Sequence, residues 1–269
     1  MTDLFQNSIR LATTSIGPLL RQSVKKEKVK KPAPNWRIHH KNFVKKSHRH
    51  HCEPGAVNFS SGWFGLGHEV SRNLHILVRE ANSIHHRQTK DYPLLPSLNI
   101  RTRTHLGPSK WIDISNGTEI FLNLTLSLIN PDLFQTGLQM LRKLRQLETT
   151  RDVALKWQSV YNGISIIVNR RTPSHRDKKG RPEWYDTLVS YSARTSRPRL
   201  SIKDIGLDLK YSSGTVVSFC GMILQHEVSG WGIGDRVCYA HFLRESVRER
   251  LDVNPAGWVN RGIYLPMDL

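Results

Sequence analysis

A polar turn after an apolar segment carries the residues of this sequence best suited to chemistry. Residues 165–168 favour a β-strand, and the chain then runs into a turn with His175 and Asp177. Because residues i and i+2 of an extended backbone point to the same side, an imidazole nitrogen and a carboxylate oxygen can reach one point. They supply two thirds of a two-histidine, one-carboxylate iron site, which leaves positions open for substrate and oxygen.

A lone His-x-Asp also occurs in solvated turns and in the active sites of other enzyme classes, so the motif alone does not identify an iron site. His-Arg-Asp is found in the catalytic loop of protein kinases, but that loop needs an Asn five residues after the Asp, where this chain has Pro182. The sequence has neither a kinase Gly-rich loop nor Asp-Phe-Gly, and it lacks the Gly-x-Ser-x-Gly elbow of serine hydrolases. Both enzyme classes are therefore set aside.

The downstream sequence strengthens the iron hypothesis. Gly214 and Gly221 mark turns between short strand-like segments. His226 falls in the last of these segments, 49 residues after Asp177, and Arg236 follows ten residues later near the start of another strand. The segments lie at residues 184–191, 200–202, 207–211, 215–220 and 222–228, and the further strand at 235–242.

This order of His-x-Asp, strands, His and Arg is similar to that of Fe(II)/2-oxoglutarate oxygenases. The surrounding stretches resemble, more narrowly, the fungal branch of the TET/JBP nucleic-acid-modifying oxygenases, and the resemblance covers residues 164–259 and extends more weakly back to residue 58. The stretches are Asn169-x-x-Thr-Pro-Ser-His-Arg-Asp, Glu183-Trp-Tyr-Asp, Tyr211-x-x-Gly-Thr-Val-Val and Gly234-Asp-Arg-Val-Cys-Tyr-Ala-His-Phe.

The resemblance implies an α+β fold, with a double-stranded β-helix (jelly-roll or cupin-like) core buttressed by helices. It implies Fe(II) and 2-oxoglutarate as cofactors, with His175, Asp177 and His226 as the catalytic metal ligands. Arg236, a planar and permanently charged fork, would bind the distal carboxylate of 2-oxoglutarate. The alternatives are purely structural roles: His226 as a hydrogen-bonded core histidine, and Arg236 in an ion pair with Asp235.

Alternation along the last strand places further residues on the face of Arg236. By resemblance, Cys238 lies near 2-oxoglutarate, and Phe242 lies where the family has an aromatic ring that stacks on a flipped base; ordinary core packing is the alternative for Phe242. Arg170, five residues before His175, matches a family position near 2-oxoglutarate and the mouth of the site.

Arg244 departs from the family pattern. Members that act on 5-methylcytosine carry a histidine at this position, which bonds the base edge. His241 is close in sequence, but alternation puts it on the opposite face of the strand. The identity of the base therefore stays open.

The chain of 269 residues has a net charge of +18 and a pI near 10.2, which suits a polyanion and favours nucleic acid over a membrane. Three cysteines argue against a secreted disulfide framework. No run of apolar residues is long enough for a transmembrane helix, and no signal peptide is recognised. Residues 1–51 are predicted to be a flexible basic arm that binds phosphates, directs nuclear import or adds solubility, and 52–269 the dioxygenase domain.

Helices are expected at residues 130–147, with an Asn130 N-cap, at 151–160 and at 244–251. Residues 118–128 alternate and are predicted to form a strand. Helices followed by many strands favour α+β, and the helices are expected to cover the outer face of a sheet.

The resemblance implies a dioxygenase that, with O₂ as co-substrate, oxidises the methyl group of 5-methylcytosine in DNA to hydroxymethyl, formyl and carboxyl forms. A base in double-stranded DNA must be flipped out to reach buried iron. The alternatives are N6-methyladenine demethylation on DNA, oxidation of methylated RNA, a non-catalytic DNA-binding module with this fold, and hydroxylation of a protein or small molecule. A nuclear location is expected from the resemblance and the basic arm.

Overall fold

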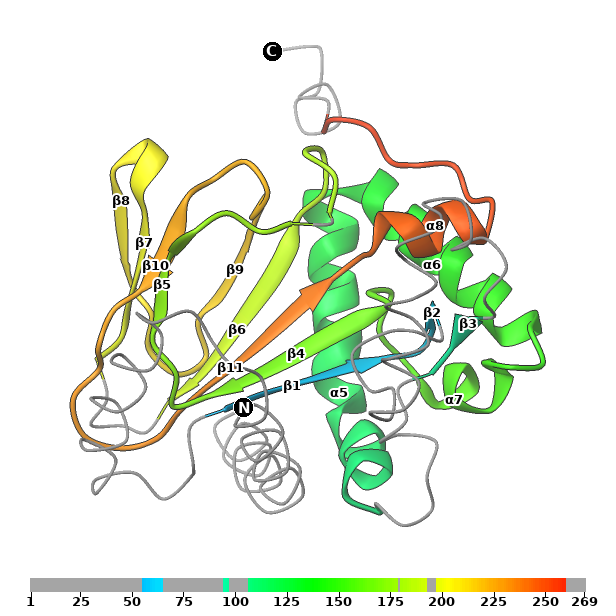
Figure 1. Cartoon of the computed structure of the whole chain (residues 1–269), viewed down its shortest axis with the longest axis horizontal. Coiled ribbons are helices and arrows are strands. Elements are labelled where there is room, and N and C mark those ends of the chain that lie inside the picture. Colours follow the sequence, from blue (N-terminus) through cyan, green and yellow to red (C-terminus); the bar gives the residue numbers. More distant parts are fainter. Residues whose placement is uncertain (1–54, 65–93, 97–105, 179, 193–196, 260–269) are drawn as a thin grey trace, which may run out of the picture.

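The computed structural model describes residues 55–64, 94–96, 106–178, 180–192 and 197–259. Its larger sheet is antiparallel and five-stranded (Figure 1). In spatial order its strands are β1 (Gly55–Ser60), β4 (Gly163–Val168), β11 (Arg236–Phe242), β6 (Asp186–Ser192) and β9 (Val216–Phe219). The predicted arm at residues 1–51 lies outside the described residues.

A second antiparallel sheet faces the first. Its order is β5 (Thr172–His175), β10 (His226–Val228), β7 (Arg199–Ile202) and β8 (Leu207–Lys210), while β2 (Trp63–Phe64) and β3 (Leu94–Leu95) form a small separate pair. Apolar side chains from both sheets form one core between them: Leu200, Ile202, Tyr211, Phe219, Val228 and Cys238. Two facing antiparallel sheets around such a core form a double-stranded β-helix, so the predicted fold is confirmed.

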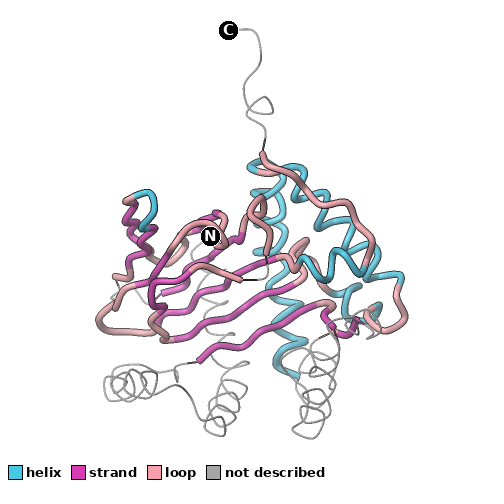
Figure 2. The backbone as a smooth tube through the Cα atoms, turned by 45° about the horizontal axis from the view of Figure 1, so that its top comes forward, coloured by secondary structure: helices cyan, strands magenta, loops and turns pink. Residues whose placement is uncertain are grey.

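Helices cover the outer face of the larger sheet, as expected (Figures 1 and 2). Trp111, in α5 (Leu106–Ile129), stacks on Phe59 of β1 with 5.4 Å between ring centroids. Its indole Nε1 also donates a hydrogen bond to the Tyr239 hydroxyl of β11, at 3.3 Å. The larger sheet is therefore apolar on both faces, because one faces the second sheet and the other faces the helices.

The remaining helices begin and end close to the predicted positions. In α6 (Pro131–Gln146), Asn130 is the N-cap and its side chain accepts a hydrogen bond from the Leu133 backbone N–H at 3.0 Å. The second, α7 (Arg151–Lys156), ends four residues before the predicted boundary at 160. The short α8 (Glu245–Arg250) follows β11, and a 3-10 turn, η3 (Lys203–Ile205), follows β7.

The predicted strand at residues 118–128 is wrong, because this segment is the second half of α5. Its apolar residues occupy both sides of a helix, so they also alternate in sequence. The residues that face the sheet, Glu119, Leu122 and Leu126, follow helical spacing. Other apolar side chains of the segment point to solvent, with Leu124 60% and Leu128 72% exposed.

The predicted strand at residues 222–228 is only partly correct, since β10 begins at His226. Residues 221–223 form a turn closed by a hydrogen bond from the Leu224 N–H to the Cys220 carbonyl, at 3.0 Å. Among the described residues, no helix is long and apolar enough to cross a membrane.

Candidate metal centre

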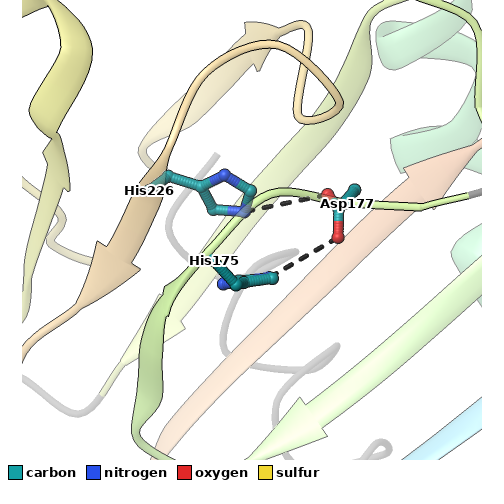
Figure 3. Close-up of side chains that lie close together, drawn as sticks. All are labelled: His175, Asp177 and His226. Carbon is teal, nitrogen blue, oxygen red and sulfur yellow. Dashed lines mark ion pairs between the residues drawn. The ribbon is translucent and has the colours of Figure 1, made fainter.

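The three predicted ligands lie together at one end of the barrel (Figure 3). His175 ends β5 and His226 begins β10, and the two are directly paired in the antiparallel register. The next residues carry the chain to Asp177, whose backbone N–H bonds to the Gly221 carbonyl at 2.8 Å. One ligand atom from each side chain lies within 4.8 Å of the others, which is compact enough for a single metal ion.

Both imidazoles present Nε2 to the carboxylate. The His175 Nε2 lies 3.5 Å from Asp177 Oδ1, and the His226 Nε2 lies 3.7 Å from Asp177 Oδ2. The opposite ring nitrogens contact backbone carbonyls, Nδ1 of His175 at 2.8 Å from Pro173 O and Nδ1 of His226 at 2.9 Å from Leu224 O. Because a carbonyl can only accept, each Nδ1 donates its proton, and Nε2 is the nitrogen that faces the carboxylate. In the neutral ring the Nε2 lone pair can bind a metal, whereas a protonated His175 donates from Nε2 to Asp177.

The electrostatics also suit metal binding. Burial lowers the pKa of His226 and favours the neutral imidazole. Burial alone would raise the pKa of Asp177, but the hydrogen bond with His175 and the positive charge of Arg244 help to keep it below its usual value. The hydrogen bond to Asp177 raises the pKa of His175. The metal-free site therefore has an ionised carboxylate, the form that binds a cation.

Two residues that the sequence analysis did not place in the site complete its floor. A Cβ on Gly221 would lie 2.3 Å from Asp177 Oδ2 and 3.0 Å from Asp186 Oδ2, so only glycine leaves room for the two carboxyls. Burial, together with the charge of Asp177, raises the pKa of Asp186 to about 8. Asp186 ends the Glu183-Trp-Tyr-Asp stretch, and the spacing of the ligands gave no signal for it.

Arg236 begins β11 and is almost fully buried, with 1% of the residue exposed. One of its terminal nitrogens donates to the Arg170 carbonyl at 2.9 Å, and its guanidinium lies 5.7 Å from the Tyr211 ring and 5.8 Å from the Trp231 ring. Its Nε has no hydrogen-bond acceptor, and no ion pair joins it to a carboxylate among the residues that the structure describes. The alternative partner Asp235 accepts a hydrogen bond from Asn169 instead.

A buried guanidinium with an unused N–H is costly without an anionic partner. The aromatic rings and the free N–H therefore fit the distal carboxylate of 2-oxoglutarate. Cys238, two residues along the same face, lies inside the barrel with its sulfur 3.3 Å from the Tyr211 hydroxyl. The Arg170 side chain is exposed, and Arg170 contacts Arg236 through its backbone carbonyl.

Phe242 and Arg244 lie at the same end of the barrel as the ligands. The Arg244 guanidinium covers the Phe242 ring, 4.1 Å from its centroid, and donates to the Lys178 carbonyl at 3.2 Å. A Cβ on Gly163 would lie 2.1 Å from the Phe242 ring, so this glycine makes room for the ring. His241 points the other way and bonds to Glu119 of α5 at 3.0 Å, as alternation predicted.

Two histidines and an aspartate that could hold one metal ion at the rim of a double-stranded β-helix, with a buried arginine inside the barrel, are typical of the class of oxygenases that depend on iron and 2-oxoglutarate. Comparison with family models agrees with this class. Residues 89–245, which are more than half of the 269, match the model Tet_JBP, oxygenase domain of the 2OGFeDO superfamily. The chain belongs to this family, and its cofactors are Fe(II) and 2-oxoglutarate.

Solved structures give weaker likenesses. One is NgTET1 in complex with 5mC DNA, with 13% identity over 58% of this chain and 57% of that chain and a TM-score of 0.44. Another is a Cupin 2 conserved barrel domain protein from Salinispora arenicola CNS-205, with 18% identity over 34% of this chain and 69% of that chain and a TM-score of 0.24. The chain thus matches little more than half the length of NgTET1. None of the curated proteins matches it.

Proposed function

We propose that this chain oxidises the methyl group of 5-methylcytosine in double-stranded DNA, with His175, Asp177 and His226 as its iron ligands. The observation that carries the proposal is the orientation of the two imidazoles. Each Nδ1 is bonded to a backbone carbonyl, so both Nε2 lone pairs point at the carboxylate side of one small space. A histidine pair that merely stabilised the fold would have no need for this convergence.

The cofactor pocket is assigned to the interior of the barrel. Arg236 would bind the distal carboxylate of 2-oxoglutarate through its free Nε–H, and Cys238 would line the same pocket. When bound, iron and 2-oxoglutarate supply the oxidation of a C–H bond by O₂, with succinate and CO₂ as by-products. The aromatic rings of Tyr211 and Trp231 exclude water from the guanidinium and so strengthen its attraction for the carboxylate.

DNA as the substrate is supported by the family and by the net charge of +18. The target base would leave the stack and enter the rim beside Arg244 and Phe242. Because the Arg244 guanidinium already covers the Phe242 ring, the base would stack on this pair or displace the arginine. The basic residues 21–51 would add contacts to phosphates, and a nuclear location is part of the same proposal.

A second candidate substrate follows from Arg244, since it replaces the histidine that family members acting on 5-methylcytosine carry. N6-methyladenine in DNA, or a methylated base in RNA, is therefore the alternative. Oxidation of an N-methyl group releases formaldehyde, whereas oxidation of a C-methyl group leaves hydroxymethyl, formyl and carboxyl products. The two substrates are thus distinguished by their products.

The test is anaerobic reconstitution with Fe(II) and 2-oxoglutarate, followed by air and duplex DNA carrying either methylated base. Mass spectrometry of the nucleosides is expected to show oxidised cytosines. The double variant His175→Ala/Asp177→Ala is the control, and it should lose turnover but keep DNA affinity, because it removes metal ligands and leaves the basic surface. Turnover that persists in this variant would overturn the ligand assignment. Loss of N6-methyladenine together with release of formaldehyde would support the alternative substrate. Iron binding without turnover on any methylated nucleic acid would instead support a DNA-binding or protein-hydroxylating role.

A further inference from the structure

An apolar turn stands at the rim of the metal centre. Residues 220–224 form a turn in the connection from β9 to β10, and two of their side chains, Met222 and Ile223, are each 40% exposed. Leu224, the next residue, is instead packed against the core between the sheets. Ile205 (59% exposed) ends the 3-10 turn between β7 and β8, and Leu207 (39% exposed) begins β8. The rim therefore presents large apolar side chains next to the metal ligands.

The backbone of this turn is fixed to the ligands. Gly221 accepts a hydrogen bond from the Asp177 N–H at 2.8 Å. The Arg176 side chain, between the two ligands of the His-x-Asp motif, donates from Nε to the Ile223 carbonyl at 2.7 Å. The same guanidinium bonds both carboxylate oxygens of Asp204, at 2.9 and 3.1 Å. The apolar side chains are thus exposed on a rigid support.

Exposed apolar side chains on a rigid support mark a contact surface. Here the flanking groups include two cations: Lys178 is exposed, and the Arg176 side chain, although it pairs with Asp204, is 50% exposed. Apolar side chains between cations match a nucleic acid, whose phosphates pair with the cations and whose base steps accept apolar wedges. They match a protein partner less well, since the core of such an interface is depleted of charge.

We infer that the turn at residues 220–224 inserts Met222 and Ile223 into the base stack of duplex DNA, where the flipped base has left a gap. This inference rests on the proposed function. An extruded base exposes the faces of its two neighbours and its orphaned partner. Apolar side chains that fill this gap offset part of the free energy of unstacking, and the turn has a fixed distance from the iron ligands.

The test compares the wild type with Met222→Ser/Ile223→Ser on three substrates that carry the same methylated base. The first is a paired duplex, the second has an abasic site opposite the target, and the third is single-stranded. The variant should lose about tenfold in kcat/KM on the paired duplex, which corresponds to about 1.4 kcal/mol. It should lose less than about twofold on the other two, because they need little or no unstacking. Leu128→Ser on α5 is the matched control, since its side chain is also exposed and apolar, and it should leave all three rates unchanged.

A second readout needs no turnover. Under anaerobic conditions, 2-aminopurine next to the target should fluoresce when the wild type binds, and the signal should fall at least severalfold with the serine variant. An equal loss on all three substrates would mean that the turn shapes the active site, and it would refute the insertion of Met222 and Ile223 (the wedge) into the base stack. Unchanged rates and unchanged fluorescence would refute the wedge as well. If the wild type oxidises no methylated DNA but the fluorescence still depends on the turn, the proposed reaction fails and the wedge stands.

Discussion

Replacement of Arg236 by methionine separates a ligand-binding role from a structural one. The side chain is 1% exposed, its Nε has no acceptor, and no carboxylate pairs with it in the part of the chain that the structure describes. If its partner is the carboxylate of 2-oxoglutarate, Arg236→Met should abolish much of the co-substrate affinity. The free energy of unfolding of the ligand-free protein should change little.

The magnitudes follow from the contacts. The substitution loses a hydrogen bond from a charged donor to the Arg170 carbonyl, about 1.5–3 kcal/mol, and two cation–π contacts of about 0.5–1 kcal/mol each. It also removes the desolvation cost of burying the guanidinium charge, which is several kcal/mol and which stabilises the variant. These effects nearly cancel, so the free energy of unfolding should change by about 1 kcal/mol or less, and Tm by about 4 °C or less. Losing one partner of a buried charge pair costs about 2–5 kcal/mol in binding, which raises the Kd for 2-oxoglutarate by about 30-fold or more.

Calorimetric titration of 2-oxoglutarate, without oxygen and with Mn(II) in place of Fe(II), measures the Kd, and scanning calorimetry of the ligand-free protein measures Tm. Arg170→Met is the control, because its side chain is exposed and its carbonyl would remain. It should bind 2-oxoglutarate within about threefold of the wild type, which is less than about 1 kcal/mol. A wild-type Kd for Arg236→Met would refute the assignment of the pocket. A fall in Tm of about 10 °C or more would show that the guanidinium stabilises the fold itself.

Two further predictions concern the rim and α8. Gly221→Ala puts a Cβ 2.3 Å from Asp177 Oδ2 and should weaken Mn(II) binding about 10- to 100-fold in calorimetry, since Gly221 sets the position of a ligand; unchanged affinity would contradict the cluster. Burial alone would raise the pKa of Glu245, but hydrogen bonds from Arg248 and Arg181 lower it. The ionised Glu245 therefore contributes its full stability above the unfolded-state pKa near 4.5, and this contribution is lost as the pH falls through the lower pKa of the folded state. In Glu245→Gln, stability at neutral pH should be lower and the fall in Tm below about pH 4.5 shallower; identical pH profiles would refute the coupling.

Much of the geometry of the candidate site was predictable, because it depends on the order of residues along strands. His175 and Asp177 are close in sequence, and the pairing of β5 with β10 brings His226 opposite His175. Strand alternation was enough to send Phe242 inward and His241 outward. The fungal branch and the methylated base remain predictions, because a single sequence does not determine either of them.

Other features depend on distances that a pattern does not contain. The need for glycine at position 221 arises from two carboxyls that approach it from β6 and from the turn after β5. The helix at residues 118–128 was missed because Ile120, Leu124 and Leu128 are apolar and yet exposed, which mimics the alternation of a strand. Burial of Glu119 against His241 is what identifies the inner face of this helix, and that pairing spans 122 residues.

The register of β11 connects the helical layer to the chemistry. Tyr239 and His241 face outward, where they bond to Trp111 and Glu119 of α5. Because side chains alternate, fixing these two residues outside also fixes Arg236 and its same-face neighbours inside the barrel. A slip of one residue would bury the His241 imidazole among the apolar residues of the barrel and would turn the Arg236 guanidinium towards the helices. The hydrogen bonds of Trp111 and Glu119 in α5 with β11 therefore help to fix the register that places Arg236 inside the barrel, on the opposite face of the sheet.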